Sequence, residues 1–212
     1  MDILRNIGAF SEQPLKTELL LHLLKTYKRP YDKINELVKQ GMLLQIKRGL
    51  YIPGPNLDLK APEPFLIANH LYGPSYVSLD AALFYWGLIP ERVFEISSVT
   101  FKKATKYQTE VGVFSYTALP LPYYSYGINQ VALTPKQTVL LASPEKALCD
   151  KIISTAGLIL SSKMQTVTYL IEDLRIEKER LRLLDSVAMQ TWINESPKKS
   201  SIEILVKTIN SL

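Results

Sequence analysis

The sequence predicts an α+β protein in which an N-terminal winged helix-turn-helix precedes a mixed α/β domain that ends in a group of helices. Three observations predict this class. Two helical patterns lead directly into a short hairpin with a basic turn, β-branched and aromatic residues dominate the middle of the chain, and apolar residues recur at helical spacing near its end. A chain of 212 residues, 47% of them hydrophobic, can build one large core or two small ones.

The first two predicted helices occupy residues 17–28 and 30–40. Thr17 is placed to cap the first helix, and lysines near its end suit the negative pole of the helix dipole. Pro30 ends that helix and can open the next, whose apolar residues fall on one face and which stops at Gly41. The second helix is therefore amphipathic, with a polar outer face.

A β-hairpin is predicted over residues 43–52. Apolar residues alternate in both of its arms, so one face can pack, while Lys47 and Arg48 would lie at an exposed tip beside Gly49. Helix, turn, helix and hairpin follow one another in the order of a winged helix-turn-helix, whose second helix enters the DNA major groove while the wing touches the backbone.

This arrangement predicts ten DNA-contacting residues. Six cations would contact phosphates: Lys28, Arg29, Lys33, Lys39, Lys47 and Arg48. Four side chains on the outer face of the second helix would face base edges: Tyr31, Asp32, Asn35 and Glu36.

Charge favours the same module. Residues 1–54 hold nine Lys and Arg against five Asp and Glu, whereas the remaining residues hold sixteen against fifteen. The alternative is a solvated surface with scattered lysines, but the excess is concentrated in the segment with the helix-helix-hairpin order. A polyanionic partner, double-stranded DNA, is the better interpretation.

A domain boundary is predicted at the Pro53-Gly54-Pro55 link, which separates a DNA-binding domain of residues 1–54 from a second domain of residues 55–212. We expect an α+β core to about residue 155 and helices over residues 156–212. In the core, helices are expected over 62–71, from a Ser78 cap to Trp86, and from a Ser143 cap onward. Short strands are expected at 93–96, 99–101, 111–114 and 139–141.

Several classes of protein and site are disfavoured. Residues 111–135 carry no charge, but their prolines, glycines and polar side chains fit buried strands better than a membrane span. Cys149 stands alone and the two histidines lie far apart, so we expect neither a disulfide nor a metal site, and no cofactor. The N-terminus lacks the pattern of a signal peptide, which favours a cytoplasmic location.

No catalytic site is predicted. The sequence has no Walker or Rossmann glycine loop and no nucleophile elbow, and its carboxylates occur singly or on exposed helical faces. Cys149 lies in an apolar helical run, where packing is the expected role. The tyrosines at 107, 116, 123, 124 and 126 could stack on nucleic acid, although core packing is the commoner role for aromatic residues in a sheet.

Three phrases of the chain resemble the AbiEi family in their order and spacing. The first is Lys47-Arg48-Gly49-Leu50-Tyr51. The second is residues 71–78, followed by Ala81-Ala82-Leu83 and residues 87–90, and the third is residues 142–150, Ala-Ser-Pro-Glu-Lys-Ala-Leu-Cys-Asp. The resemblance covers about residues 16–153. The chain departs from it at Ala81, where family members often carry a second serine.

Members of that family are antitoxins of type IV toxin-antitoxin systems, some of them linked to abortive phage infection. The resemblance implies an N-terminal winged helix that binds repeats in its own promoter and represses the operon. It also implies that residues 55–212 oppose a nucleotidyltransferase-like toxin without forming a stable complex with it. Two other hypotheses remain open: an enzyme that modifies the toxin or a nucleic acid, and a ligand-responsive regulator whose effector would bind at the charge-free segment 111–135.

Overall fold

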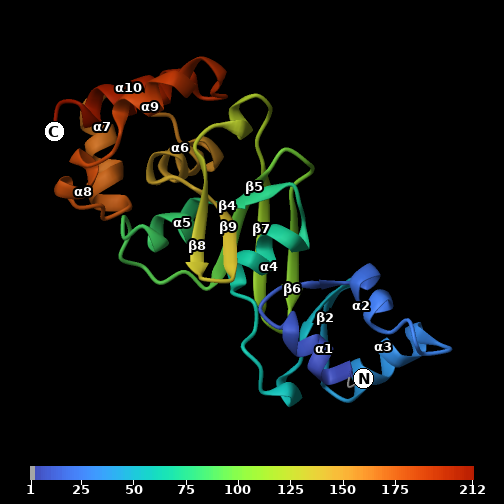
Figure 1. Ribbon diagram of the computed structural model, residues 1–212. Helices are drawn as coiled ribbons and strands as arrows, with labels where there is room; N and C mark the ends of the chain where they lie inside the picture. Colours follow the sequence, from blue (N-terminus) through green and yellow to red (C-terminus); the bar gives the residue numbers. More distant parts are fainter. Residues whose placement is uncertain (1–2) are drawn as a thin grey trace.

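The computed structural model describes residues 3–212 and contains an N-terminal unit, a sheet unit and a group of C-terminal helices, arranged end to end (Figure 1). Residues 1 and 2, which fall in the predicted DNA-binding domain and in the N-terminal stretch considered for a signal peptide, lie outside this range. The N-terminal unit, residues 3–54, has a small antiparallel sheet in the order β1-β3-β2. Its elements are α1 (Ile3–Ala9), β1 (Leu15–Lys16), α2 (Thr17–Leu23), α3 (Pro30–Lys39), β2 (Leu43–Lys47) and β3 (Leu50–Pro53).

The sheet unit, residues 55–155, is built around a mixed six-stranded sheet in the order β6-β7-β5-β4-β9-β8. Its strands are β4 (Ser75–Val77), β5 (Glu95–Thr100), β6 (Thr105–Thr109), β7 (Gly112–Ala118), β8 (Ile128–Thr134) and β9 (Gln137–Ala142). The strand pairs β5–β7 and β4–β9 are parallel and the others antiparallel. Three helices and two 3₁₀ turns complete the unit: α4 (Pro64–Leu71), α5 (Leu79–Tyr85), α6 (Pro144–Ser154), η1 (Pro55–Leu57) and η2 (Tyr123–Ser125).

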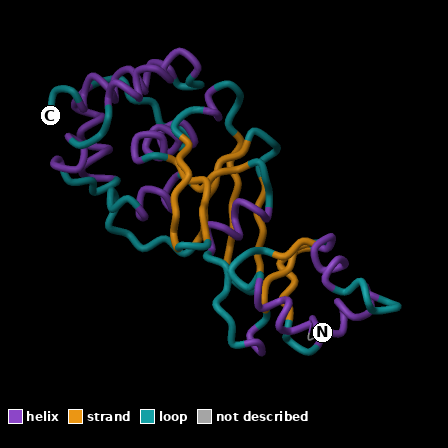
Figure 2. The backbone as a smooth tube through the Cα atoms, in the orientation of Figure 1, coloured by secondary structure: helices purple, strands orange, loops and turns teal. Residues whose placement is uncertain are grey.

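The C-terminal helices, residues 156–212, cover α6 at the end of the molecule farthest from the N-terminal unit, which leaves the sheet in the middle (Figure 2). They are α7 (Lys163–Thr168), the π-helix η3 (Tyr169–Asp173), α8 (Lys178–Arg182), α9 (Ser186–Trp192), the 3₁₀ turn η4 (Ile193–Glu195) and α10 (Lys199–Ile209). The helix-rich ending and the mixed α+β class are as predicted. No helix among residues 3–212 has the length and apolar character needed to cross a membrane.

The β2–β3 hairpin is buried on both faces, and all four residues of β3 are buried. Leu43 and Tyr51 pack into the core of the N-terminal unit with the apolar residues of α2 and α3. Ile46, Leu50 and Ile52 belong to the core of the sheet unit. The sequence predicted packing on one face of the hairpin, and the sheet unit covers the second face as well.

A second contact joins the two units. The carboxylate of Glu12, in the loop after α1, lies 3.2 Å from the Lys136 ammonium and 3.4 Å from that of Lys60. The hydrogen bond from Lys136 is the largest influence on the Glu12 carboxyl and lowers its pKa. Glu12 thus links the N-terminal unit to the turn between β8 and β9.

Several helix boundaries differ from those predicted. The first helix ends at Leu23, not at residue 28. The residues after Leu24 form turns, and Arg29, which precedes Pro30, has a non-helical backbone with φ −132° and ψ 75°. Thr17 is the first residue of that helix and not its cap. The helix expected from residue 62 begins at Pro64.

The strands and the C-terminal helices also differ in part from the predictions. The two short strands expected at 93–101 form one, β5, and the strands β4, β6 and β8 were not among those expected. Among the apolar residues that recur at helical spacing near the end of the chain, Met164 and Val187 were expected to pack but are 81% and 72% exposed. Their helices are short, so each buries fewer positions than a long stripe implies.

A buried ionic network lies at the centre of the sheet unit, where the sequence predicted no assembled polar group. Lys146 and Asp150, one turn apart on α6, are both fully buried, and their charged groups lie 3.1 Å apart. The Asp150 carboxylate accepts hydrogen bonds from the hydroxyls of Tyr76, Ser78 and Tyr123 at 2.7–3.0 Å. Ser78 therefore binds Asp150 and does not cap α5 with its side chain.

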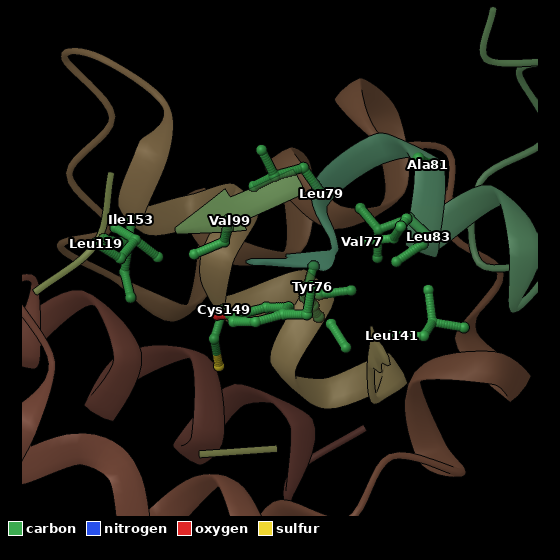
Figure 3. Close-up of a cluster of buried hydrophobic side chains, with 14 of the residues drawn as sticks. Tyr76, Val77, Leu79, Ala81, Leu83, Val99, Leu119, Leu141, Cys149 and Ile153 are labelled. Carbon is green, nitrogen blue, oxygen red and sulfur yellow. The ribbon is translucent and has the colours of Figure 1, made fainter. Parts of the chain in front are cut away.

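The topology explains this convergence. Strand β4 lies parallel to β9, and α6 follows β9 directly, so α6 packs over Tyr76 on β4 and over Ser78, the residue that follows the strand. Ser143 caps α6 as predicted, accepting a bond from the Lys146 amide. The Lys146 ammonium also donates to the Tyr123 carbonyl and lies 3.3 Å from the centre of the Tyr123 ring. Figure 3 shows the surrounding core, including Tyr76, Val99, Leu141 and Cys149.

Replacing Asp150 by Asn should destabilise the protein by about 3–5 kcal/mol, because the Lys146 ammonium would keep its buried place without its counter-charge. Urea unfolding of the full chain measures this. Asp58→Asn, the same chemical change at an exposed loop position, is the matched control and should change stability little. In a double-mutant cycle, Lys146→Met and Asp150→Asn together should cost less than the sum of the single losses. Additive losses would contradict the proposed coupling.

Gly54 provides a second test of the fold. A Cβ atom built on Gly54 would overlap the carbonyl oxygen of Gly41, which is backbone and cannot turn away. We expect Gly54→Ala to cost about 1–3 kcal/mol in the free energy of unfolding. Gly8→Ala is the control, since a Cβ there meets nothing closer than 3.7 Å and alanine favours the helix α1. Equal stabilities of the two variants would be inconsistent with the close approach.

Candidate nucleic-acid interface

Helix α3 presents a polar face to solvent, as the sequence predicted. Ile34 and Leu37 are buried in the core of the N-terminal unit, and the predicted base-facing residues lie on the opposite side of the helix. Tyr31 is 61% exposed. Asp32, Asn35, Glu36 and Lys39 are exposed as well. An exposed tyrosine next to amide and charged side chains offers both stacking and hydrogen-bonding groups.

Four of the predicted contact residues are paired with one another. Arg29 lies 3.5 Å from the Asp32 carboxylate, and the Lys33 ammonium lies 2.9 Å from that of Glu36. The bond from Lys33 lowers the pKa of Glu36. The Arg29–Asp32 pair is exposed, and such pairs contribute little stability, so Arg29 can exchange the carboxylate for a phosphate at small cost. The Lys33 side chain is only 21% exposed. Asn35 and Lys39 enter neither of these pairs.

Lys47 is not at an exposed tip. It is partly buried, its ammonium donates a hydrogen bond to the Leu71 carbonyl at the end of α4, and it lies 5.9 Å from the centre of the Tyr107 ring. Burial, and then the nearby Lys102 and Lys16 ammonium groups, lower the pKa of Lys47. The correction follows from the docking of the hairpin on the sheet unit. Arg48, the next residue, is exposed as expected.

A groove separates the hairpin from the end of α4 and the turn that follows it; we call it the basic groove. Its volume is about 590 Å³, and its lining includes Lys16, Lys47, Arg48 and His70 together with, among the described residues, one acidic residue, Glu18. Lys102 stands at its edge, where its ammonium donates to the Gly73 carbonyl at 2.6 Å. Sequence analysis did not single out Lys16 or Lys102, because nothing local marks two lysines that meet only in the fold.

The other sequence candidates have structural roles. Tyr116, Tyr123 and Tyr124 are buried, so the core-packing interpretation holds for them. Cys149 is fully buried, which raises the pKa of its thiol, and its predicted packing role is confirmed. Within residues 3–212, no group of three or more His, Cys, Asp and Glu side chains is arranged to hold a metal ion.

No family model matches the chain, and no curated protein is similar to it. The three phrases that resemble the AbiEi family can nevertheless be located in the fold. The first forms the tip of the hairpin and β3, and the other two supply Tyr76, Ser78, Lys146 and Asp150 to the buried network. Much of the resemblance therefore lies in residues that hold the sheet unit together.

Lys47 is partly buried and Arg48 is exposed, and this difference gives a test of the docked hairpin. Lys47→Met keeps most of the apolar stem but removes the donor to Leu71, so we expect a loss of about 1 kcal/mol in the free energy of unfolding. Arg48→Met removes the same charge from an exposed side chain and should leave stability unchanged. Urea titrations of both variants check this. A larger loss from Arg48→Met than from Lys47→Met would contradict the docked position of Lys47.

Proposed function

We propose that this chain is a cytoplasmic DNA-binding protein whose N-terminal unit acts as a winged helix-turn-helix. The observation that carries the proposal is the exposed polar face of α3 within a unit whose helices α2 and α3 precede a β-hairpin. In this role α3 enters a major groove of double-stranded DNA, Asn35 and Tyr31 face base edges, and Lys39 and Arg48 contact phosphates. The excess of basic residues in the first 54 positions supports a polyanionic partner.

The resemblance to the AbiEi family extends this proposal to an antitoxin. The DNA would be repeats in the protein's own promoter, so that binding represses the operon. Residues 55–212 would oppose a nucleotidyltransferase-like toxin without holding it in a stable complex. Support for this half of the proposal comes from the three sequence phrases alone.

Salt dependence of binding tests the DNA contact. If the chain neutralises about six phosphates, the logarithm of its affinity should fall with that of salt concentration with a slope of roughly five. Lys39→Gln and Arg48→Gln should each lower the slope by about one and weaken binding to all duplexes alike. Lys163→Gln, an exposed lysine on α7 among the C-terminal helices, is the control. Affinity that does not depend on salt in gel-shift titrations would refute the proposal.

Base readout has a separate test. Asn35→Ala removes an amide that can bond a base edge but no charge, so the salt slope should stay constant. Preference at one or two operator positions should relax, with a loss of about 1–3 kcal/mol of discrimination there. Selection of bound sequences from a random duplex pool, followed by titration of single-base variants, measures this. An unchanged preference would exclude Asn35 from base contact.

The two proposed activities can be separated in cells that carry the toxin gene and a promoter reporter. The Lys39→Gln/Arg48→Gln double variant should lose repression, because both changed residues lie on the proposed DNA surface. It should still neutralise the toxin, because residues 55–212 are unaltered. Loss of neutralisation by a correctly folded double variant would show that the antitoxin activity depends on DNA binding.

A further inference from the structure

The basic groove brings together cations from elements far apart in the sequence. Lys16 lies on β1, opposite Leu50 in the small sheet, and Lys47 and Arg48 lie at the adjoining end of the hairpin. The facing side comes from residues 69–74 of the sheet unit, with His70 at the end of α4 and Lys102 held against Gly73. The groove therefore has one basic side from each unit.

These charges are not neutralised within the structure. Among the described residues, no carboxylate lies within ion-pair distance of the Lys16, Lys47, Arg48 or Lys102 side chains. Glu18 is the single acidic residue in the groove lining that the structure describes. The lysines are close enough that Lys102 and Lys16 both lower the pKa of Lys47. Cations gathered in a groove without carboxylate partners attract an anion.

We propose that the basic groove binds a phosphate of the duplex backbone, so that the DNA contact extends from Lys16 in the N-terminal unit to Lys102 in the sheet unit. This inference rests on the proposed function and adds to it a second phosphate-binding surface, which reaches beyond the predicted DNA-binding domain at Lys102. The groove adjoins Arg48, which already belongs to the proposed interface.

The exposure of the cations favours a backbone phosphate over a small free anion. Lys16, Arg48 and Lys102 are all exposed at the edges of the groove. Sites for small ligands usually enclose most of the ligand surface and approach it with a few fixed polar groups. Exposed lysines on two opposed sides suit a strand that passes between them, since each contact depends on charge and not on enclosed shape.

The pKa of His70 should change when an anion occupies the groove. Partial burial of its ring, and then the Lys16 ammonium, lower the pKa of His70. The charged groups that face it are Lys16, Glu18, Lys47, Arg48 and, at the edge, Lys102. A phosphate among these groups stabilises the protonated ring, so binding should raise the pKa of His70 and take up a proton.

The experiment uses the full chain and its Lys16→Gln and Lys102→Gln variants, with Lys163→Gln as the charge-matched control. A 20-base-pair duplex is titrated over a range of salt concentrations, and the His70 imidazole is followed by NMR against pH. Because the protein has two histidines, His22→Gln assigns the signals. Each groove variant should lower the salt slope by about one, which corresponds to five- to tenfold weaker binding at about 0.1 M salt. The duplex should raise the pKa of His70 in the wild type, and the control should behave as wild type.

Duplex binding with unchanged slopes in both groove variants would overturn the inference while leaving the proposed function intact. Inorganic phosphate alone is the second arm. If it raises the pKa of His70 as far as the duplex does while the slopes stay unchanged, the groove holds free phosphate and the commitment to the backbone is wrong. If the wild type binds no duplex, the proposed function fails and the inference fails with it.

Discussion

The organisation of this protein depends on a hairpin that is buried on both faces. Leu43 and Tyr51 close the core of the N-terminal unit, whereas Ile46, Leu50 and Ile52 close that of the sheet unit. Each fully buried aliphatic side chain is worth about 1.5–3 kcal/mol, so the three residues on the second face bind the units firmly to each other. The DNA-binding surface proposed for α3 therefore has a fixed position relative to the sheet. Cations from both units can then contact phosphates of one DNA strand.

The buried network shows a different constraint, because two charges are kept in an apolar core. Removing Lys146 and Asp150 from water is costly, and the structure offsets that cost with three hydroxyl donors to Asp150 and a carbonyl acceptor for Lys146. Tyr76 lies on β4, Ser78 directly follows that strand and Tyr123 lies in η2, so these contacts fix the position of α6 on the sheet. The hydroxyls are themselves affected, since burial first, and then Asp150, raises the pKa of Tyr76 and of Tyr123. The network thus specifies the packing of elements that the chain brings together from distant segments.

Local chemistry decides the elements that could be predicted from the sequence. Pro30 and Gly41 bracket α3 to within a residue, and the turn at Gly49, where φ is +85°, places the hairpin. Features whose partners are distant in the sequence could not be predicted. Alternation in the hairpin indicated one packed face but could not reveal the second, and Ser78 matched a helix cap while its actual partner lies 72 residues away. No local signal marked the network, because Lys146 and Asp150, four residues apart, match an ordinary surface ion pair of a helix.

The distribution of charge in the fold also differs from its distribution along the sequence. Counting by segment assigned the basic excess to residues 1–54, yet the surface that attracts an anion is set by which cations remain unpaired and where they meet. Arg29 and Lys33 are paired with carboxylates on α3, and Lys47 is used in docking the hairpin. Lys102 lies in a segment with almost no net excess, but the fold carries it to the edge of the basic groove. Electrostatic attraction acts through space, so the candidate phosphate-binding site extends beyond the domain boundary that composition indicated.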